Sequence, residues 1–219
     1  MPVFTPTEMP HREAYKLLIG AILPRPIAWV STISPRGIRN LAPFSFFTVV
    51  CPEPMTICFA PSRRRDGSKK DTLRNCEETG EFVVSIVSEA LAEQMNLSCA
   101  DLPYEEDEFL FARLESAPSA AVKPPRVAGA KVAYECVLDQ VIHVGGAKDG
   151  AGSLVLGTVV RIYVSEDVWT GARIDTDALN AIGRCAGDEY TRTTDRFSMI
   201  RPGNPGGPTL PDFRSLSPR

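Results

Sequence analysis

Hydroxyl, amide and aromatic side chains gather in residues 25–47, which read RPIAWVSTISPRGIRNLAPFSFF. One set offers hydrogen-bonding groups suited to a phosphate or a polar ring edge: Ser31, Thr32, Asn40 and Ser45. A second set offers apolar walls for a flat ring: Trp29, Phe46 and Phe47. This combination favours a groove that binds a flat and partly charged molecule. The alternative is ordinary strand packing, the usual role of aromatic strand residues.

A strand, a turn and an irregular segment are expected to carry these side chains. Residues 27–34 alternate, so Ile27 and Trp29 share one face of a strand while their neighbours share the other. The following SPRG predicts a turn, because proline presets φ and glycine accepts a positive φ. Pro43 has no N–H group, so residues 40–47 cannot form a regular central strand and are expected to be irregular.

A basic run precedes a short predicted helix. Arginines occupy positions 63–65 and lysines positions 69 and 70, ahead of a helix over residues 73–79 that Asp71 or Thr72 caps and Gly80 ends. A helix N-terminus offers unpaired N–H groups and a positive dipole end, which favour phosphate binding. The alternative is a solvated basic loop.

Three further patterns are interpreted as having no cofactor chemistry of their own. The glycine-rich residues 145–152 match neither nucleotide-binding loop and predict a hairpin connection. The acidic run at residues 105–108 is typical of a solvated loop. The two histidines, His11 and His143, belong to no cluster with metal-ligand spacing. We expect a structural or substrate-edge role for His143.

Composition narrows the class of protein. The chain has 219 residues, of which 43% are hydrophobic and 23% charged, as in an ordinary globular domain. The net charge of −3 argues against nucleic-acid and membrane-surface partners. The six cysteines are scattered without a C-x-x-C pair, and no secretory signal or membrane span is evident. We therefore expect a cytoplasmic protein.

The remaining segments predict a mainly β fold with a few short helices. Strands are expected at residues 55–60, 81–88, 132–144 and 154–164, with a bulge at Gly157, and helices at residues 13–22 and 89–97. Residues 101–127 form a long proline-rich connection, typical of a lid or a subunit contact. We expect one domain over residues 1–202 and a flexible tail over residues 203–219.

Three motifs together carry a family resemblance. They are RPIAWVST with a glycine turn and NLAPFSFF, then KDTL from Lys70 with GEFVVSIV over residues 80–87, and IGRCAGDEYTRTTDRFSMIRP over residues 182–202. Over roughly residues 15–202 the chain resembles the flavin-reductase-like family, whose members bind FMN on a split β-barrel. The resemblance implies that fold, and it implies a set of cofactor-binding residues: Trp29, Ser31, Thr32, Asn40, Leu41, Ala42, Pro43, Ser45, Phe46, Phe47, Lys70, Thr72, Arg184 and Tyr190.

The resemblance also implies a function. The expected enzyme is an NAD(P)H-dependent FMN reductase, in which hydride passes from NADH or NADPH to flavin N5 without a catalytic side chain. A homodimer is implied, and so is a flavin-dependent monooxygenase as a recipient of reduced flavin. Two alternatives stay open: a flavoredoxin-like electron carrier that does not use NAD(P)H, and a flavin-binding module without turnover.

Overall fold

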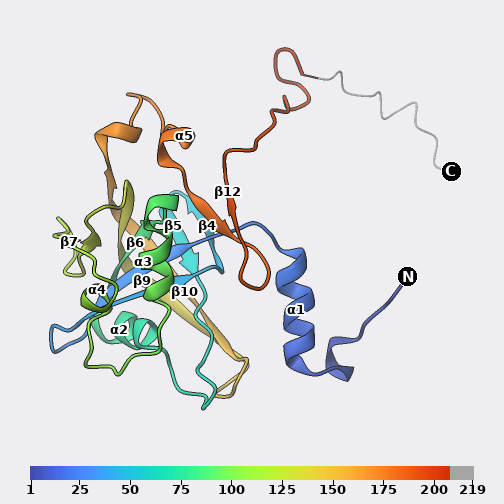
Figure 1. Cartoon of the computed structure of the whole chain (residues 1–219), viewed down its shortest axis with the longest axis vertical. Coiled ribbons are helices and arrows are strands. Elements are labelled where there is room, and N and C mark those ends of the chain that lie inside the picture. The colour runs from blue at the N-terminus through green and yellow to red at the C-terminus, as the bar shows by residue number, and fades with distance from the viewer. Residues whose placement is uncertain (208–219) are drawn as a thin grey trace.

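The structure, a computed structural model, describes residues 1–207 and is built on one seven-stranded antiparallel sheet (Figure 1). In spatial order the strands are β3 (Arg39–Phe44), β2 (Ala28–Ile33), β6 (Glu81–Ile86), β9 (Val132–Val144), β10 (Gly152–Val164), β5 (Met55–Phe59) and β4 (Phe47–Pro52). The expectation of a mainly β fold with few short helices is confirmed.

The sheet curls until its two ends meet. Strands β3 and β4 follow each other in the chain, yet they lie at opposite ends of the sheet. Phe44 of β3 packs against Phe59 of β5 with ring centroids 5.2 Å apart, and Phe59 packs against Phe82 of β6 at 5.4 Å. These rings belong to one buried core with Ala28 and Val30 of β2. The core therefore fills the interior of a barrel.

Gly157 of β10 leaves room for an aromatic ring inside this barrel. A Cβ atom at this position would lie 2.3 Å from Cζ of Phe82, far inside van der Waals contact. The register between β9 and β10 shifts between Leu156 and Gly157, which confirms the predicted bulge.

Helix α2 (Asp71–Thr79) closes one side of the barrel by burying Leu73 and Cys76 in its core. It ends at Gly80, whose φ of 73° is left-handed, as predicted. Its start differs from the prediction. The N-cap is Lys70, which makes no side-chain cap, and Asp71 already belongs to the first helical turn.

A second core covers the outer face of β2. Trp29 and Leu41 lie in it, beneath η2 (Glu89–Leu91), α3 (Ala92–Leu97) and α4 (Glu108–Phe111). The long connection after residue 101 is packed against the barrel and contains α4, β7 (Ser116–Ala117) and β8 (Arg126–Val127). The buried carboxylate of Glu135 anchors this connection by accepting hydrogen bonds from the N–H groups of Ala120 and Ala121.

Helix α1 (His11–Ala21), which follows η1 (Pro6–Glu8), stands at the side of the barrel and has no buried residue (Figure 1). Beside it lies a small sheet of β1 (Arg25–Pro26), β11 (Ile182–Arg184) and β12 (Tyr190–Arg192). The remaining elements are η3 (Glu166–Val168) and α5 (Thr176–Leu179). No helix in residues 1–207 combines the length and apolar character that crossing a membrane requires.

The segment expected to be irregular is more regular than predicted. Residues 40–47 belong mostly to β3 and to the start of β4, with only a short corner between them. Pro43 is tolerated because β3 is an edge strand, where a missing N–H group breaks no central ladder. Most of the predicted tail, residues 208–219, lies outside the described residues.

Candidate functional site

Two adjoining cavities open where the β3–β4 corner meets α1 and the start of α2. The polar cavity has a volume of about 210 Å³ and is bounded by the corner, the start of α2, residues 98–102 and Glu108. The outer cavity, of about 510 Å³, lies between α1, α3 and residues 184–190. Both cavities share Tyr15, Pro43, Ser45 and Cys99, so they form one continuous groove.

The N-terminus of α2 supplies the hydrogen-bond donors of the polar cavity. Lys70 and Thr72 line it, and the N-cap side chain leaves the first N–H groups of the helix without a side-chain acceptor. Lys70 forms no ion pair among residues 1–207. An uncapped helix start beside an unpaired lysine is well suited to bind an anion.

Arg64 neutralises the carboxylates nearest to this helix start. Its Nη2 lies 2.7 Å from Oδ2 of Asp71, and its Nε lies 3.1 Å from Oδ1 of Asp101. The hydrogen bond to Asp71 is the main cause that raises the pKa of Arg64. Of the three arginines in the basic run, only Arg64 lines the polar cavity among the described residues. The basic run of residues 63–70 is therefore not only a solvated loop, because Arg64 and Lys70 line the polar cavity.

Asn40 joins the elements behind the polar cavity. Its Oδ1 accepts hydrogen bonds from the hydroxyls of Thr72, at 2.7 Å, and Thr32, at 3.2 Å. Its Nδ2 donates to Oε1 of Glu108 at 2.8 Å. Thr32 also accepts a hydrogen bond from Asn75 of α2 at 3.0 Å. One amide thereby connects β2, β3, α2 and α4, and all five side chains are buried.

Glu108 is the buried carboxyl group of this network. It is only 5% exposed, and its Oε2 accepts a hydrogen bond from the backbone N–H of Leu41 at 3.1 Å. Burial raises the pKa of Glu108 to about 7. The interpretation of residues 105–108 as a solvated loop is therefore wrong in part. Glu105 pairs with Arg36 at the surface, whereas Asp107 caps α4.

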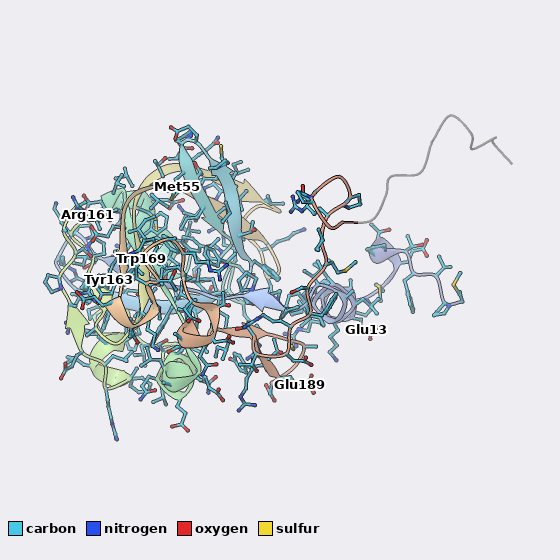
Figure 2. All side chains as sticks on the ribbon, turned by 90° about the horizontal axis from the view of Figure 1, so that it is seen from above. Glu13, Met55, Arg161, Tyr163, Trp169 and Glu189 are labelled. Atoms are coloured by element: carbon cyan, nitrogen blue, oxygen red, sulfur yellow. The ribbon has the colours of Figure 1, made fainter. Side chains whose placement is uncertain are left out.

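Arg25 fastens the walls of the outer cavity. The residue is 5% exposed, and its guanidinium donates hydrogen bonds of 2.8 Å to the carbonyls of Ile19, Ile22 and Cys185. The Arg184 guanidinium stacks over the Tyr190 ring, 4.5 Å from its centroid. Figure 2 shows Glu189, in the β11–β12 connection, on the same side of the molecule as Glu13 of α1. The outer cavity is thus lined by arginine and tyrosine side chains.

The structure brings most of the sequence-predicted site residues to this groove. The polar cavity is lined by Asn40, Ala42, Pro43, Ser45, Phe46, Lys70 and Thr72, and the outer cavity by Pro43, Ser45, Arg184 and Tyr190. A second group lines neither cavity: Trp29, Ser31, Thr32, Leu41 and Phe47. The side chains of Trp29 and Ser31 are engaged inside the protein, with Ser98 Oγ and the Pro125 carbonyl as their acceptors. Of the two, only Trp29 contacts a groove residue, because Ser98 lines the polar cavity.

Sequence reasoning missed several groove residues: Tyr15, Arg25, Cys99 and Glu108. Tyr15 and Cys99 carry no spacing signal, because the groove forms only when α1 and the loop after α3 meet the barrel. Glu108 had one weak signal. It precedes an apolar Phe-Leu-Phe run, as a residue at the start of a packed helix does.

The glycine-rich residues 145–152 and His143 lie outside the groove and have structural roles. Residues 145–151 connect β9 and β10, which confirms the predicted hairpin. His143 contacts Ser153 Oγ through Nδ1 at 2.9 Å and Glu77 Oε1 through Nε2 at 3.2 Å. It lines neither cavity, so it ties the hairpin to α2.

The chain is similar to known proteins in both sequence and structure. Residues 20–176 match the model of the flavin reductase like domain. A protein of Halalkalibacterium halodurans is 43% identical over 90% of this chain and 95% of its own length. Nitrilotriacetate monooxygenase component B from Bacillus cereus is 38% identical, with a TM-score of 0.87 over 91% of this chain and 98% of its own.

Further solved structures share the fold at varying identity. Pseudomonas fluorescens 2-nitrobenzoate 2-nitroreductase is 30% identical, with a TM-score of 0.80 over 97% of this chain and 98% of its own. A Shewanella frigidimarina structure described as having a split barrel domain is 19% identical, with a TM-score of 0.76, covering 89% and 94% of the two chains. The flavoredoxin of Desulfovibrio vulgaris is 21% identical at a TM-score of 0.68, covering 81% and 91%. The last two show the fold alone, and that fold is the split barrel.

Asn40 is predicted to hold the site together as well as to line it. Asn40→Ala leaves the Glu108 carboxyl group and the Thr72 hydroxyl without their buried partner, and we expect a loss of about 1–3 kcal/mol in the free energy of unfolding. Ser45→Ala is the matched control, because the Ser45 hydroxyl accepts only a long 3.4 Å bond from Arg25. Urea unfolding of both variants and of the unmodified protein measures the free energies of unfolding. Equal unfolding free energies would show that the network adds no stability.

Proposed function

The chain belongs to the flavin reductase like family, and from this premise we propose that it is an FMN-dependent oxidoreductase that takes hydride from NADH or NADPH. The observation that carries the proposal is the position of Lys70 and Thr72. Both lie at the uncapped start of α2, in a cavity that opens directly beside the β3–β4 corner. We take residues 1–202 as the domain that does this.

The residues of the groove fit FMN. The FMN phosphate carries about −1.5 to −2 charge and favours cations, hydroxyls and backbone N–H groups. Lys70 offers the cation, and Thr72 and the rest of the first turn of α2 offer backbone N–H groups, since the Thr72 hydroxyl already donates to Asn40. The β3–β4 corner offers Pro43 and Phe46 as apolar walls and Ser45 as a polar contact for the ring system.

When bound, the flavin supplies the redox chemistry, accepting hydride at N5 from a nicotinamide. The chain's own residues bind and orient it and restrict the access of water. Arg64 holds Asp71 and Asp101 in ion pairs, which reduces their repulsion toward a phosphate. The Asn40 network fixes Thr72 through a 2.7 Å hydrogen bond. No proton-transferring side chain is required for the hydride step.

The outer cavity is the proposed place for a second molecule over the flavin. Its volume of about 510 Å³ lies within the range of small-molecule sites, and Arg184 and Tyr190 offer a cation and an aromatic ring. The sequence carries no dinucleotide-binding fingerprint, so a nicotinamide cofactor would dock there transiently. Reduced flavin would then serve a monooxygenase, a role supported by the 38% identity to a monooxygenase component.

A second candidate function is the reduction of a nitroaromatic acid. It is favoured by the 30% identity to the 2-nitroreductase, which extends over nearly the whole chain. It is also favoured by the arginine and tyrosine side chains of the outer cavity, which suit an aromatic carboxylate. A flavoredoxin-like carrier and a binding module without turnover remain the alternatives that involve no NAD(P)H.

We further propose that the chain forms a homodimer. Helix α1 exposes Leu17 and Leu18 and buries no residue, while Phe197, Met199 and Ile200 are exposed near the described end of the chain. A two-fold interface would bury such apolar side chains through one repeated patch. Light scattering at micromolar concentration should give about twice the chain mass, with or without FMN. A monomer that binds FMN and oxidises NADH would contradict the dimer.

Anaerobic mixing separates the reductase from the alternatives. The FMN-loaded protein should lose its flavin absorbance near 450 nm when NADH or NADPH is added, because hydride transfer bleaches the oxidised ring. Adding 2-nitrobenzoate to the reduced protein should restore the absorbance only if the second candidate is right. Loss of colour with dithionite but with neither nicotinamide would exclude the reductase and leave the carrier and the binding module without turnover.

Lys70 is predicted to bind the FMN phosphate. Lys70→Ala should weaken FMN binding by about 1.5–3 kcal/mol, because a charge-assisted bond is lost, and should leave riboflavin binding unchanged. Lys69→Ala is the matched control, since Lys69 pairs with Glu77 and lines neither cavity. Fluorescence titration measures each Kd. An unchanged Kd in Lys70→Ala would show that Lys70 belongs to a solvated basic loop and does not bind the phosphate.

A further inference from the structure

We propose that Glu108 takes up a proton when the FMN phosphate enters the polar cavity, so that this one carboxyl group ties the affinity for FMN to pH. The proposal rests on the proposed function, because it assumes that FMN binds in this groove. It concerns a residue outside the set predicted from the sequence.

The Glu108 carboxyl group is buried at the wall of the polar cavity. It receives two hydrogen bonds, from the Asn40 amide at 2.8 Å and from the Leu41 backbone at 3.1 Å. Neither donor carries a positive charge. Glu108 has no ion pair among residues 1–207, although a buried carboxylate ordinarily needs one.

Apart from Lys70, the cations on the neighbouring elements are already held by other carboxylates. Arg39 of β3 lies 2.6 Å from Asp107 and 2.8 Å from the Ser116 hydroxyl. Arg64 is held by Asp71 and Asp101. Lys70 is the remaining cation in the cavity wall. Cys99 also lines the cavity, and partial desolvation raises the pKa of its thiol, which therefore stays neutral.

The wall of the polar cavity therefore holds an excess of negative charge. Three carboxyl groups, Asp71, Asp101 and Glu108, face two cations, Arg64 and Lys70. A phosphate adds about −1.5 to −2 charge to this balance. Because Arg64 already stabilises the first two carboxylates, Glu108 is the group that can lose its charge at the lowest cost.

Protonation of Glu108 is within reach at neutral pH. Burial raises its pKa to about 7, and the charge of Asp71 contributes in the same direction. A phosphate in the same cavity raises this pKa further, because it disfavours the charged carboxylate. Well below pH 7 the group is already neutral and binding needs no proton, whereas as the pH rises through 7 a growing fraction of binding events must take up a proton and the affinity for FMN falls.

Calorimetry of FMN binding at pH 7 in HEPES and in Tris tests the proposal in the unmodified protein. The two buffers differ in ionisation enthalpy, so the difference in observed heat counts the protons exchanged. We expect an uptake of about half a proton per FMN. Riboflavin, which lacks the phosphate, should bind without uptake. FMN binding without proton uptake, or equal uptake with riboflavin, would overturn the proposal.

Two variants assign the proton to its residue. Glu108→Gln should abolish the uptake, while Glu105→Gln, which changes an exposed carboxylate in the same run, should retain it. Between pH 7 and pH 8.5 the Kd of the unmodified protein should rise about three- to tenfold relative to that of Glu108→Gln. Parallel pH profiles would refute the role of Glu108. A failure of FMN to bind the unmodified protein at all would refute the proposed function itself, and the two failures are thereby distinguished.

Discussion

The site depends on one buried side chain, Asn40, whose amide can be satisfied only when four elements are in place. Its oxygen accepts from Thr32 on β2 and Thr72 on α2, and its nitrogen donates to Glu108 on α4. An unsatisfied buried amide is costly, so the network selects a single arrangement of the strands and helices. That arrangement places the start of α2, and with it Lys70, beside the β3–β4 corner.

The barrel explains why the corner is available for binding. Because β3 and β4 end the sheet on opposite sides, the chain must turn between them without a neighbouring strand. The corner at Ser45 and Phe46 is therefore irregular and open to solvent, while Phe44 and Phe59 seal the barrel just behind it. A rigid core thus carries a short exposed segment, an arrangement that many binding sites share.

Local sequence patterns predicted those parts of the fold that depend on the conformational preferences of neighbouring residues. The alternation at Ile27 and Trp29, the left-handed Gly80 and the bulge at Gly157 are of this kind. The family motifs, in turn, indicated the part of the polar cavity that the β3–β4 corner and the start of α2 supply. The burial of Glu108 could not be predicted, because its partner Asn40 is 68 residues away in the chain. The same holds for Tyr15, whose helix reaches the groove through tertiary contacts alone.

The central claim is that the polar cavity at the start of α2 binds the phosphate of FMN. A crystal structure of the chain with FMN tests it most directly. We predict that the phosphate lies within hydrogen-bonding distance of Lys70 Nζ and the Thr72 backbone N–H, with the ring system against the β3–β4 corner. A phosphate bound elsewhere, for example beside Arg184 in the outer cavity, would contradict the account.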